Sequence, residues 1–297
     1  LNVVLLPALE AGGTVVLIRG FDPVAAIGAI AEHGVTTLTG PPTVWRVFLD
    51  LPAEAAPADS FASVRIAASG ASALPIEVGE GIRDRFGIRI HEGYGLTETS
   101  PVVATTAGTD APIGSIGRPL PGVEVRLVDA DGDDVLVGDV GEIHVRGANV
   151  FAGYWDAPDA TAAVLTPDGW LRTGDLATVD DDGNLFVVDR MKDLVIVSGF
   201  NVYPAEVEGA LLAHPAVAEA AVVGEPHPRT GEAVVAHVVL RAGVPAPSPD
   251  ELVAAVAERL ARYKCPHEVR IVDEIPRGMG GKIMRHRLDD GGGRGTL

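Results

Sequence analysis

SVRIAASGASALPIEVGEGIRDRFGIRIHEGYG, residues 63–95, alternates two strand-like apolar segments with one helical segment. The strand-like segments are SVRIAASG and IRIHEGYG, and the helical segment between them is IEVGEGIRDRFG. Alternation of this kind is typical of parallel strands joined by helices that cover the faces of a sheet. This stretch therefore predicts a parallel sheet.

The same alternation precedes residue 63. Asp22 can cap a helix there, and Pro23 can occupy its first helical position. The expected segments are strand TVVLIR (14–19), helix FDPVAAIGAIAEHG (21–34), strand VTTLTG (35–40) and helix TVWRVFLDL (43–51). We predict an α/β fold with a mostly parallel sheet and helices on its faces. Ligands of such sheets bind beyond the carboxyl ends of the strands, where SGASALP (69–75) and HEGYGLTE (91–98) fall.

The sequence changes character twice after this region. Residues 112–190 hold short strand-like segments separated by Gly and Asp turns, which predicts a small β subdomain. From there to the end, strand and helix signals alternate again within a short length. We expect a large domain at 1–190, made of an α/β part (1–111) and the β subdomain, followed by a compact α+β C-terminal domain at 191–297.

The final helix of the C-terminal domain has a clear start signal. Ser248 and Glu251 form a capping box around a Pro at the first helical position. Leu252, Val256 and Leu260 then follow at intervals of four residues, which predicts a stripe that faces the core.

The overall charge limits the kinds of partner. Acidic residues outnumber basic ones by 41 to 23, for a net charge of -18. This balance argues against nucleic acid or an anionic membrane as the main partner. Cys265 is the single cysteine, so no disulfide can form within the chain, and we expect it to be a packed small residue. A single cysteine fits a reducing, cytoplasmic location. We expect no transmembrane segment, because no apolar run has membrane-spanning length.

Metal sites of the common kinds are not expected. Acidic turns at 129–140 and 180–191 resemble EF-hand loops, but neither has Gly at position six. Val140 and Met191 stand where that loop needs a carboxylate. The eight His residues include no HxxxH pair, which argues against a zinc site.

Four further motifs carry a family resemblance. They are YGLTE (94–98), GWLRTGD (169–175), DRMKDLVIVSGFNVYPAEVE (189–208) and PRGMGGKIMR (276–285). Their order and approximate spacing resemble the adenylate-forming superfamily, and acyl-CoA synthetases and fatty-acid-CoA ligases in particular. The resemblance implies an ATP-dependent ligase that converts a carboxylic acid, most often a fatty or other apolar acid, to acyl-AMP and then to acyl-CoA. It also implies ATP/AMP, CoA and Mg²⁺ as cofactors.

The YGLTE loop has side chains suited to a nucleotide. Tyr94 can stack on adenine, Gly95 permits close backbone approach, Thr97 offers a hydroxyl to a phosphate, and Glu98 offers oxygens to Mg²⁺. The loop alone would favour a core Tyr and a surface Glu. The resemblance favours the nucleotide roles, with Thr97 and Glu98 as catalytic residues.

The resemblance assigns roles to other pocket positions as well. The backbone at Gly70 and Ala71 is expected to line the adenine and acyl pocket. Val44 and Trp45 are expected to border the acyl pocket. SGASALP has neither the spacing nor the Lys of a P-loop.

Three charged residues complete the expected adenylation site. By resemblance, Asp175 binds the ribose hydroxyls, Arg190 contacts the ribose and phosphate region, and Lys282 is the catalytic cation at the α-phosphate. A positive charge there would stabilise the negative charge that develops during transfer. The family usually has Gly where this chain has Asp189, and the glycine-rich stretch before Lys282 is looser than usual.

The resemblance also implies that one site serves two half-reactions. Lys192 matches the hinge about which the C-terminal domain turns between adenylation and thioester formation. Ser198, Gly199 and Phe200 would then line the tunnel for pantetheine.

Residues 1–297 contain no Ser/Thr/Gly-rich loop ending in Lys-Gly, which such enzymes use for the outer ATP phosphates. We therefore expect an N-terminally truncated member, inactive alone. Two alternatives stay open: a ligase that loads an acyl-carrier phosphopantetheine, and a non-catalytic nucleotide-binding remnant.

Overall fold

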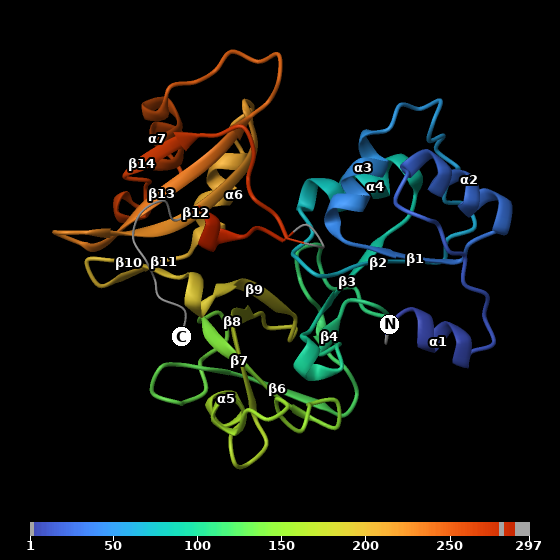
Figure 1. Cartoon of the computed structure of the whole chain (residues 1–297), viewed down its shortest axis with the longest axis horizontal. Coiled ribbons are helices and arrows are strands. Elements are labelled where there is room, and N and C mark those ends of the chain that lie inside the picture. The colour runs from blue at the N-terminus through green and yellow to red at the C-terminus, as the bar shows by residue number, and fades with distance from the viewer. Residues whose placement is uncertain (1–2, 279–281, 289–297) are drawn as a thin grey trace. The chain divides into compact units, whose positions relative to one another are not determined.

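The computed structural model describes residues 3–278 and 282–288 (Figure 1). The chain divides into two compact units. Unit 1 comprises Leu1–Thr173 and Ala177–Val187, and unit 2 comprises Gly174–Leu176 and Val188–Leu297. The three residues Gly174–Leu176 thus group with unit 2, although they lie inside the expected large domain. The domain boundary at residue 190 stays a prediction.

The first sheet of unit 1 is mixed. Its strands, in spatial order, are β1 (Thr37–Gly40), β2 (Ile66–Ser69), β3 (Ile90–Tyr94), β4 (Ala104–Thr105) and β5 (Arg118–Pro119). The β1–β2 and β2–β3 pairs are parallel, whereas the β3–β4 and β4–β5 pairs are antiparallel. The α/β class is confirmed, and the parallel part of this sheet is limited to its first three strands.

Helices between these strands form where the sequence predicts them. They are α2 (Pro23–His33), α3 (Pro42–Asp50) and α4 (Ile76–Phe86), and the short α1 (Leu5–Glu10) precedes them. Asp22 caps α2, since its Oδ1 accepts a hydrogen bond of 2.7 Å from Ala25 N. A cluster of edge-to-face aromatic rings fills the core of this part and consists of Trp45, Phe48, Phe61 and Phe86.

Two expectations for this region were wrong. Residues 14–19 form no strand, and Leu17 within them is 86% exposed. A strand needs a partner for its N–H and C=O groups, and this run has strand composition without one. Trp45 is fully buried, and its indole N–H lies 3.2 Å from Gly40 O and 3.3 Å from Ala68 O. It therefore belongs to the core and does not line a pocket surface.

The β subdomain forms a second sheet. It has the order β6 (Val123–Val128), β7 (Gly141–Gly147), β8 (Leu171–Val179) and β9 (Leu185–Arg190), and α5 (Pro158–Val164) lies between β7 and β8 in the chain. Each of β8 and β9 is divided between the two units, with some of its residues in unit 1 and the others in unit 2. Its buried side chains include Ile143, Val145, Ala177 and Leu185.

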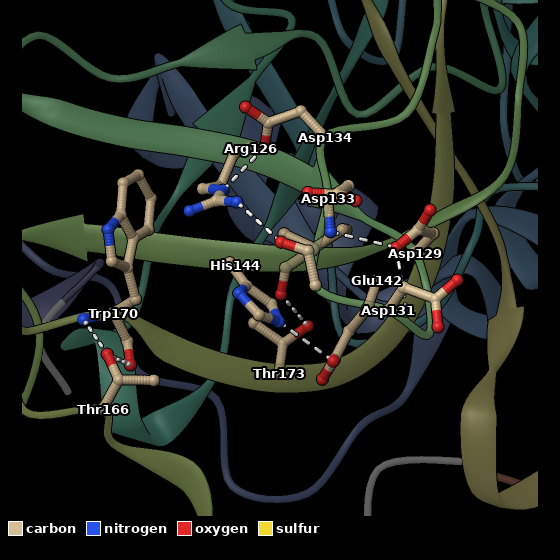
Figure 2. Close-up of polar contacts among 12 residues, drawn as sticks. Arg126, Asp129, Asp131, Asp133, Asp134, Glu142, His144, Thr166, Trp170 and Thr173 are labelled. Atoms are coloured by element: carbon tan, nitrogen blue, oxygen red, sulfur yellow. Dashed lines mark hydrogen bonds and ion pairs between the residues drawn. The ribbon is translucent and has the colours of Figure 1, made fainter.

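The acidic turn after β6 is closed by its own backbone. Asp129 Oδ1 accepts hydrogen bonds from Asp131 N (2.9 Å) and Asp133 N (3.0 Å), and Arg126 Nε contacts Asp134 Oδ1 at 2.7 Å (Figure 2). The hydrogen bonds to Asp129 thus shape the turn, and Arg126 offsets the charge of Asp134. Within residues 3–278 and 282–288, no group of three or more His, Cys, Asp or Glu side chains is arranged to hold a metal.

Unit 2 contains a third sheet. Its strands are β10 (Val195–Val197), β11 (Phe200–Val202), β12 (Val217–His227), β13 (Gly231–Leu240) and β14 (Glu268–Ile271). The order is β11-β10-β13-β12, and β14 pairs in parallel with β13. Its helices are α6 (Pro204–Leu212) and α7 (Pro249–Ala257).

The predicted start of α7 is confirmed. Ser248 Oγ accepts from Glu251 N at 3.3 Å, while Ser248 N donates to Glu251 Oε2 at 2.7 Å. Leu252 and Val256 are fully buried, and Leu260 packs against the same core. Four short 3-10 helices complete the described structure: η1 (Thr97–Thr99), η2 (Met191–Asp193), η3 (Arg262–Lys264) and η4 (Arg285–Arg287). Among the described residues, no helix is both long and apolar enough to cross a membrane.

Adjacent leucines of α6 allow a test of this core. Leu211 is fully buried, whereas Leu212 is 44% exposed. We expect Leu211→Ala to lower the free energy of unfolding of unit 2 by about 2–5 kcal/mol, because it leaves a cavity. Leu212→Ala, the matched control, should cost under about 1 kcal/mol. Urea unfolding monitored by amide hydrogen exchange in α6 and β12 measures both, and equal losses would contradict the assigned packing.

Candidate functional site

Thr99 holds the loop that follows β3. Its side chain is fully buried, and its hydroxyl oxygen accepts a hydrogen bond of 3.0 Å from Leu96 N. The same hydroxyl lies 3.0 Å from Leu96 O and 2.9 Å from Pro101 O. Sequence analysis singled out Thr97 and Glu98 but missed the threonine beside them, which supports the turn that carries both.

Two close contacts fix the backbone of this loop. A Cβ built on Gly95 would lie 1.6 Å from Pro101 O, so only Gly fits there. We expected this Gly to permit approach of a nucleotide, and the structure shows that it permits approach of the loop's own backbone. Asn149 Nδ2 then donates to Thr99 O and to Val102 O, each at 3.1 Å.

Glu98 is oriented by an aromatic side chain. Tyr154 donates its hydroxyl hydrogen to Glu98 Oε1 at 2.8 Å, and the Glu98 carbonyl accepts from Phe151 N at 2.8 Å. The hydrogen bond to Glu98 raises the pKa of Tyr154. Thr97 is exposed, and Tyr94 is half-buried against the β-subdomain core. A carboxylate held by one oxygen keeps lone pairs for a cation, which suits Mg²⁺ ligation.

The loop after β2 has an unusual backbone. Ala71 has a φ of 74°, a left-handed conformation that costs energy for a residue with a Cβ. Gly70 has room, since an added Cβ would lie 3.7 Å from Gly93 O. Ser69 Oγ is buried without a hydrogen-bond partner among the described residues. An unsatisfied buried hydroxyl beside a strained turn is the kind of feature that a ligand would satisfy.

Glu92 ties this loop to the sheet, and sequence analysis missed it. It is 5% exposed and accepts hydrogen bonds from Leu74 N (3.3 Å) and Gly114 N (2.7 Å). Burial raises its pKa, although the two backbone hydrogen bonds oppose the shift. A carboxylate inside an apolar strand segment was the available signal, because buried charges need partners.

Asp175 and Arg190 form an ion pair in unit 2. Arg190 Nε lies 2.9 Å from Asp175 Oδ1, and Asp175 is 4% exposed, whereas Arg190 is half-buried. Asp175 lies on β8 and Arg190 ends β9, so two neighbouring strands bring them together. The pair presents a fixed guanidinium and a fixed carboxylate, which suit a phosphate and vicinal hydroxyls respectively.

Asp189, the departure from the family pattern, has a structural role. Its two oxygens accept from Arg190 N (2.8 Å) and from Ala205 N (2.9 Å), the second residue of α6. No side chain at the N-cap residue Tyr203 does this. Burial raises the pKa of Asp189, and these two hydrogen bonds oppose the increase. The aspartate thus fixes the turn at Arg190 and the start of α6 together.

Lys282 lies among the same charges. Its side chain is exposed by surface area, yet partial desolvation lowers its pKa, and Arg190 and Lys192 lower it further. Asp175 acts in the opposite direction. The Asp175–Arg190 pair is thus among the charges that act on the Lys282 ammonium. Residues 279–281 of the predicted glycine-rich stretch lie outside the described residues.

Ser198, Gly199 and Phe200 lie at the tip of a hairpin. Ser198 (φ 52°) and Gly199 (φ 84°) connect β10 to β11 as a two-residue turn with both φ values positive. Phe200 is 57% exposed and lies 4.9 Å from the ring of Tyr263. Their role in a pantetheine tunnel stays a prediction.

The structure therefore assembles the predicted residues in two groups. Unit 1 holds the loop residues, which are Gly70, Ala71, Tyr94, Gly95, Thr97 and Glu98. In unit 2 Asp175 pairs with Arg190, and the charges of Asp175, Arg190 and Lys192 act on Lys282. The second group offers cations and one carboxylate to an anionic, hydroxyl-bearing ligand.

Comparison with known proteins decides the family. Residues 1–155 match the model of the AMP-binding enzyme family, and residues 206–282 match the AMP-binding enzyme C-terminal domain. The chain belongs to the AMP-binding enzyme family. The resemblance expected from the four motifs is confirmed.

Relatives of this AMP-binding chain include CoA ligases. It is 42% identical to a feruloyl-CoA synthase from Amycolatopsis sp (96% of this chain, 57% of the relative). It is 41% identical to a long-chain-fatty-acid–CoA ligase from Yersinia pestis (95% and 50%). The crystal structure of ATP-bound MatB from Rhodopseudomonas palustris superposes with a TM-score of 0.89 at 35% identity (95% and 55%). The chain thus spans about half the length of the relatives it matches.

The backbone contact at Gly95 of this AMP-binding chain generates a test. We expect Gly95→Ala to lower the stability of unit 1 by about 1–3 kcal/mol, because the Pro101 carbonyl must move. Gly93→Ala is the matched control, since its Cβ would meet Ala104 O at an ordinary 3.8 Å. Thermal unfolding of both variants measures the difference. Equal midpoints would show that the loop adapts without cost.

Proposed function

We propose that this chain is part of an ATP-dependent carboxylic acid:CoA ligase. The reaction would join an acid to ATP with release of pyrophosphate and then transfer the acyl group from AMP to CoA. The observation that carries the proposal is the convergence of Asp175, Arg190 and Lys282 in unit 2. The family membership and the ligase names of two relatives support it.

Each of these residues has a physical task in the first half-reaction. The Arg190 guanidinium and the Lys282 ammonium would stabilise the negative charge that builds on the α-phosphate when a carboxylate attacks it. Asp175 would accept hydrogen bonds from the ribose hydroxyls. Mg²⁺ would neutralise phosphate charge, and we propose Glu98 as one of its ligands. The Oε1 atom of Glu98 already accepts a hydrogen bond from Tyr154. Thr97 would donate its exposed hydroxyl to a phosphate.

The second half-reaction needs a different face of unit 2. We assign the hinge to Lys192, at the centre of η2 (Met191–Asp193). Rotation there would withdraw Lys282 after adenylation and bring the Ser198–Gly199 turn to the acyl-adenylate. Ser198 has a small side chain and Gly199 has none, so this turn leaves room for a narrow thiol arm.

A cavity in unit 2 favours free CoA over an acyl-carrier protein as the acceptor. It has a volume of about 660 Å³, and its lining includes Arg229, Arg262, His227, His267 and Tyr263. Cations and an aromatic ring suit the phosphates and adenine of CoA, whereas a carrier's phosphopantetheine arm has no adenine. Thioester yield with CoA compared with a holo-carrier decides between them.

The acid itself is proposed to be apolar, aliphatic or aromatic. Two relatives of nearly equal identity, 42% and 41%, are named for feruloyl and long-chain fatty acyl groups, so overall identity does not select one acid. A panel of ferulate, a long-chain fatty acid and a small polar acid tests the class. Preference for the polar acid would contradict it.

Pyrophosphate release tests the reaction. We expect little from the 297-residue chain, which contains no Ser/Thr/Gly-rich Lys-Gly loop. We expect turnover from a fusion that supplies the part of the Amycolatopsis relative that this chain does not match. In that fusion Lys282→Ala should lower adenylation about 10²–10³-fold, because a preorganised charge is lost. Lys264→Ala, which removes a cation paired with Glu206 at 2.6 Å, is the matched control.

Calorimetry with AMP addresses the non-catalytic alternative. Binding of AMP that is lost in Asp175→Ala, together with no pyrophosphate release by the fusion, would favour a nucleotide-binding remnant. Robust turnover by the 297-residue chain would instead overturn the proposed dependence on the part of the relatives that this chain does not match.

The state of Lys282 predicts a pH effect. Only the protonated ammonium can stabilise the phosphate, and desolvation together with Arg190 lowers its pKa. Adenylation should therefore decline as pH rises through a value below the ordinary lysine pKa of about 10.4. In Lys282→Arg the residual activity should extend to higher pH. A pH profile of single-turnover pyrophosphate release measures this, and an unchanged alkaline limb would contradict the role.

A further inference from the structure

A half-buried arginine lies three residues after Lys282. Arg285 begins η4, and its Nη2 donates to Glu208 Oε1 at 2.6 Å. Its Nε donates to Val222 O on β12 at 3.2 Å, and its Nη1 lies 3.8 Å from Asp193 Oδ2 on η2. The guanidinium therefore joins α6, β12 and η2 to the segment that carries Lys282.

The partner of Arg285 is itself fixed. Glu208 Oε1 accepts a hydrogen bond of 2.8 Å from Val222 N, so this carboxylate connects α6 to β12 before the arginine is counted. Burial raises the pKa of Glu208, and Arg285 opposes that shift. Two half-buried, partly desolvated opposite charges with directed hydrogen bonds favour one geometry, because a displacement would leave a partly desolvated charge without its partner.

The backbone transmits this position to Lys282. Gly278 N donates to Lys282 O at 2.8 Å, and Met284 N donates to Pro276 O at 2.8 Å. Leu288, after η4, is buried in the cluster that also contains Val223 and Val235. Lys282 is thus held on one side by the strand-like pairing and on the other by Arg285 and Leu288.

Asp193 interacts with both Arg285 and Lys282. It lies in η2, beside Lys192, and it acts on Arg285 and on the Lys282 ammonium. The proposed hinge segment η2 and the segment that carries the proposed catalytic lysine therefore both contact the half-buried guanidinium of Arg285.

We propose that Arg285, locked by Glu208 and Asp193, is a positioning residue that holds the Lys282 segment in a fixed place relative to η2. This inference rests on the proposed function for its catalytic consequence. Arg285 touches no reacting atom in the scheme above. Through Arg285, the segment that carries Lys282 would move together with η2 when unit 2 rotates.

The first test uses the 297-residue chain itself. Lys192, Lys264 and Lys282 are its only lysines, so NMR of ¹³C-methylated lysines can be assigned with single Lys→Arg variants. In Arg285→Met the pKa of Lys282 should rise toward the ordinary value of about 10.4, because the ammonium leaves its partly desolvated place. Arg287→Met removes an equal charge from an exposed position of η4 and should leave the pKa of Lys282 nearly unchanged.

The second test separates the half-reactions in the active fusion. Arg285→Met should lower pyrophosphate release about 10- to 100-fold, as expected when a catalytic group is displaced by about 1 Å. Thioester formation from supplied acyl-adenylate, which does not use Lys282, should change by less than about threefold. Arg287→Met should resemble the parent in both.

Two further variants guard against loss of folding. Arg285→Lys keeps the charge but cannot reach all three partners, so it should show the same split in weaker form. The double variant Arg285→Met with Glu208→Gln leaves no lone, partly desolvated charge, and its Gln can still accept from Val222 N. It should show the adenylation defect at near-parent melting temperature.

The outcomes distinguish this inference from the proposed function. If the fusion adenylates and Lys282→Ala abolishes the reaction, but Arg285→Met affects neither the Lys282 pKa nor the split, the positioning role is wrong. Equal losses in both half-reactions with a lowered melting temperature would mean that Arg285 is merely structural. If Lys282→Ala has no effect, the proposed function fails, while the NMR shift still decides whether Arg285 places Lys282.

Discussion

The ion pair between Asp175 and Arg190 is the contact on which the site of unit 2 depends. It joins the edges of β8 and β9 at 2.9 Å, with the carboxylate nearly removed from solvent. Burying a charge is unfavourable unless its partner is fixed, so each neighbouring element must hold that geometry. Asp189 does so by accepting from the Arg190 N–H and from the first turn of α6. The end of β9 and the start of α6 are thereby positioned by Asp175 and Asp189.

Unit 1 meets a different constraint, the close approach of backbone to backbone. Gly95 against Pro101 and Gly117 against Thr105 leave no space for a Cβ, at 1.6 Å and 2.0 Å from the opposing carbonyl oxygens. Thr99 and Asn149 then satisfy the carbonyls of the same turn. The loop with Thr97 and Glu98 is therefore rigid before any ligand arrives. Preorganised groups need less reorganisation when charge develops on a ligand.

Local signals predicted much of the fold, and tertiary contacts decided what they missed. Asp22 with Pro23 and Ser248 with Glu251 identified the starts of α2 and α7, because capping depends on residues three positions apart. The motifs pointed to Asp175, Arg190 and Lys282, whereas the donors to Glu92 and Glu208, Gly114 N and Val222 N, lie 22 and 14 residues away in the chain and could not be identified locally. The strand predicted at 14–19 and the pocket position predicted for Trp45 were wrong for the same reason. Strand pairing and pocket exposure both depend on residues that are distant in the sequence.

The acidic net charge of the chain means that an anionic ligand has to be attracted by nearby cations. With a net charge of -18, the chain as a whole repels an anionic substrate, and screening removes most of that repulsion beyond about 8 Å at physiological salt. Attraction must therefore come from cations at short range. Two of the three lysines are Lys192 and Lys282, and desolvation together with repulsion from Arg190 and Lys192 lowers the pKa of Lys282. A bound phosphate would relieve that repulsion, so the same crowding that costs the free protein stability favours the ligand.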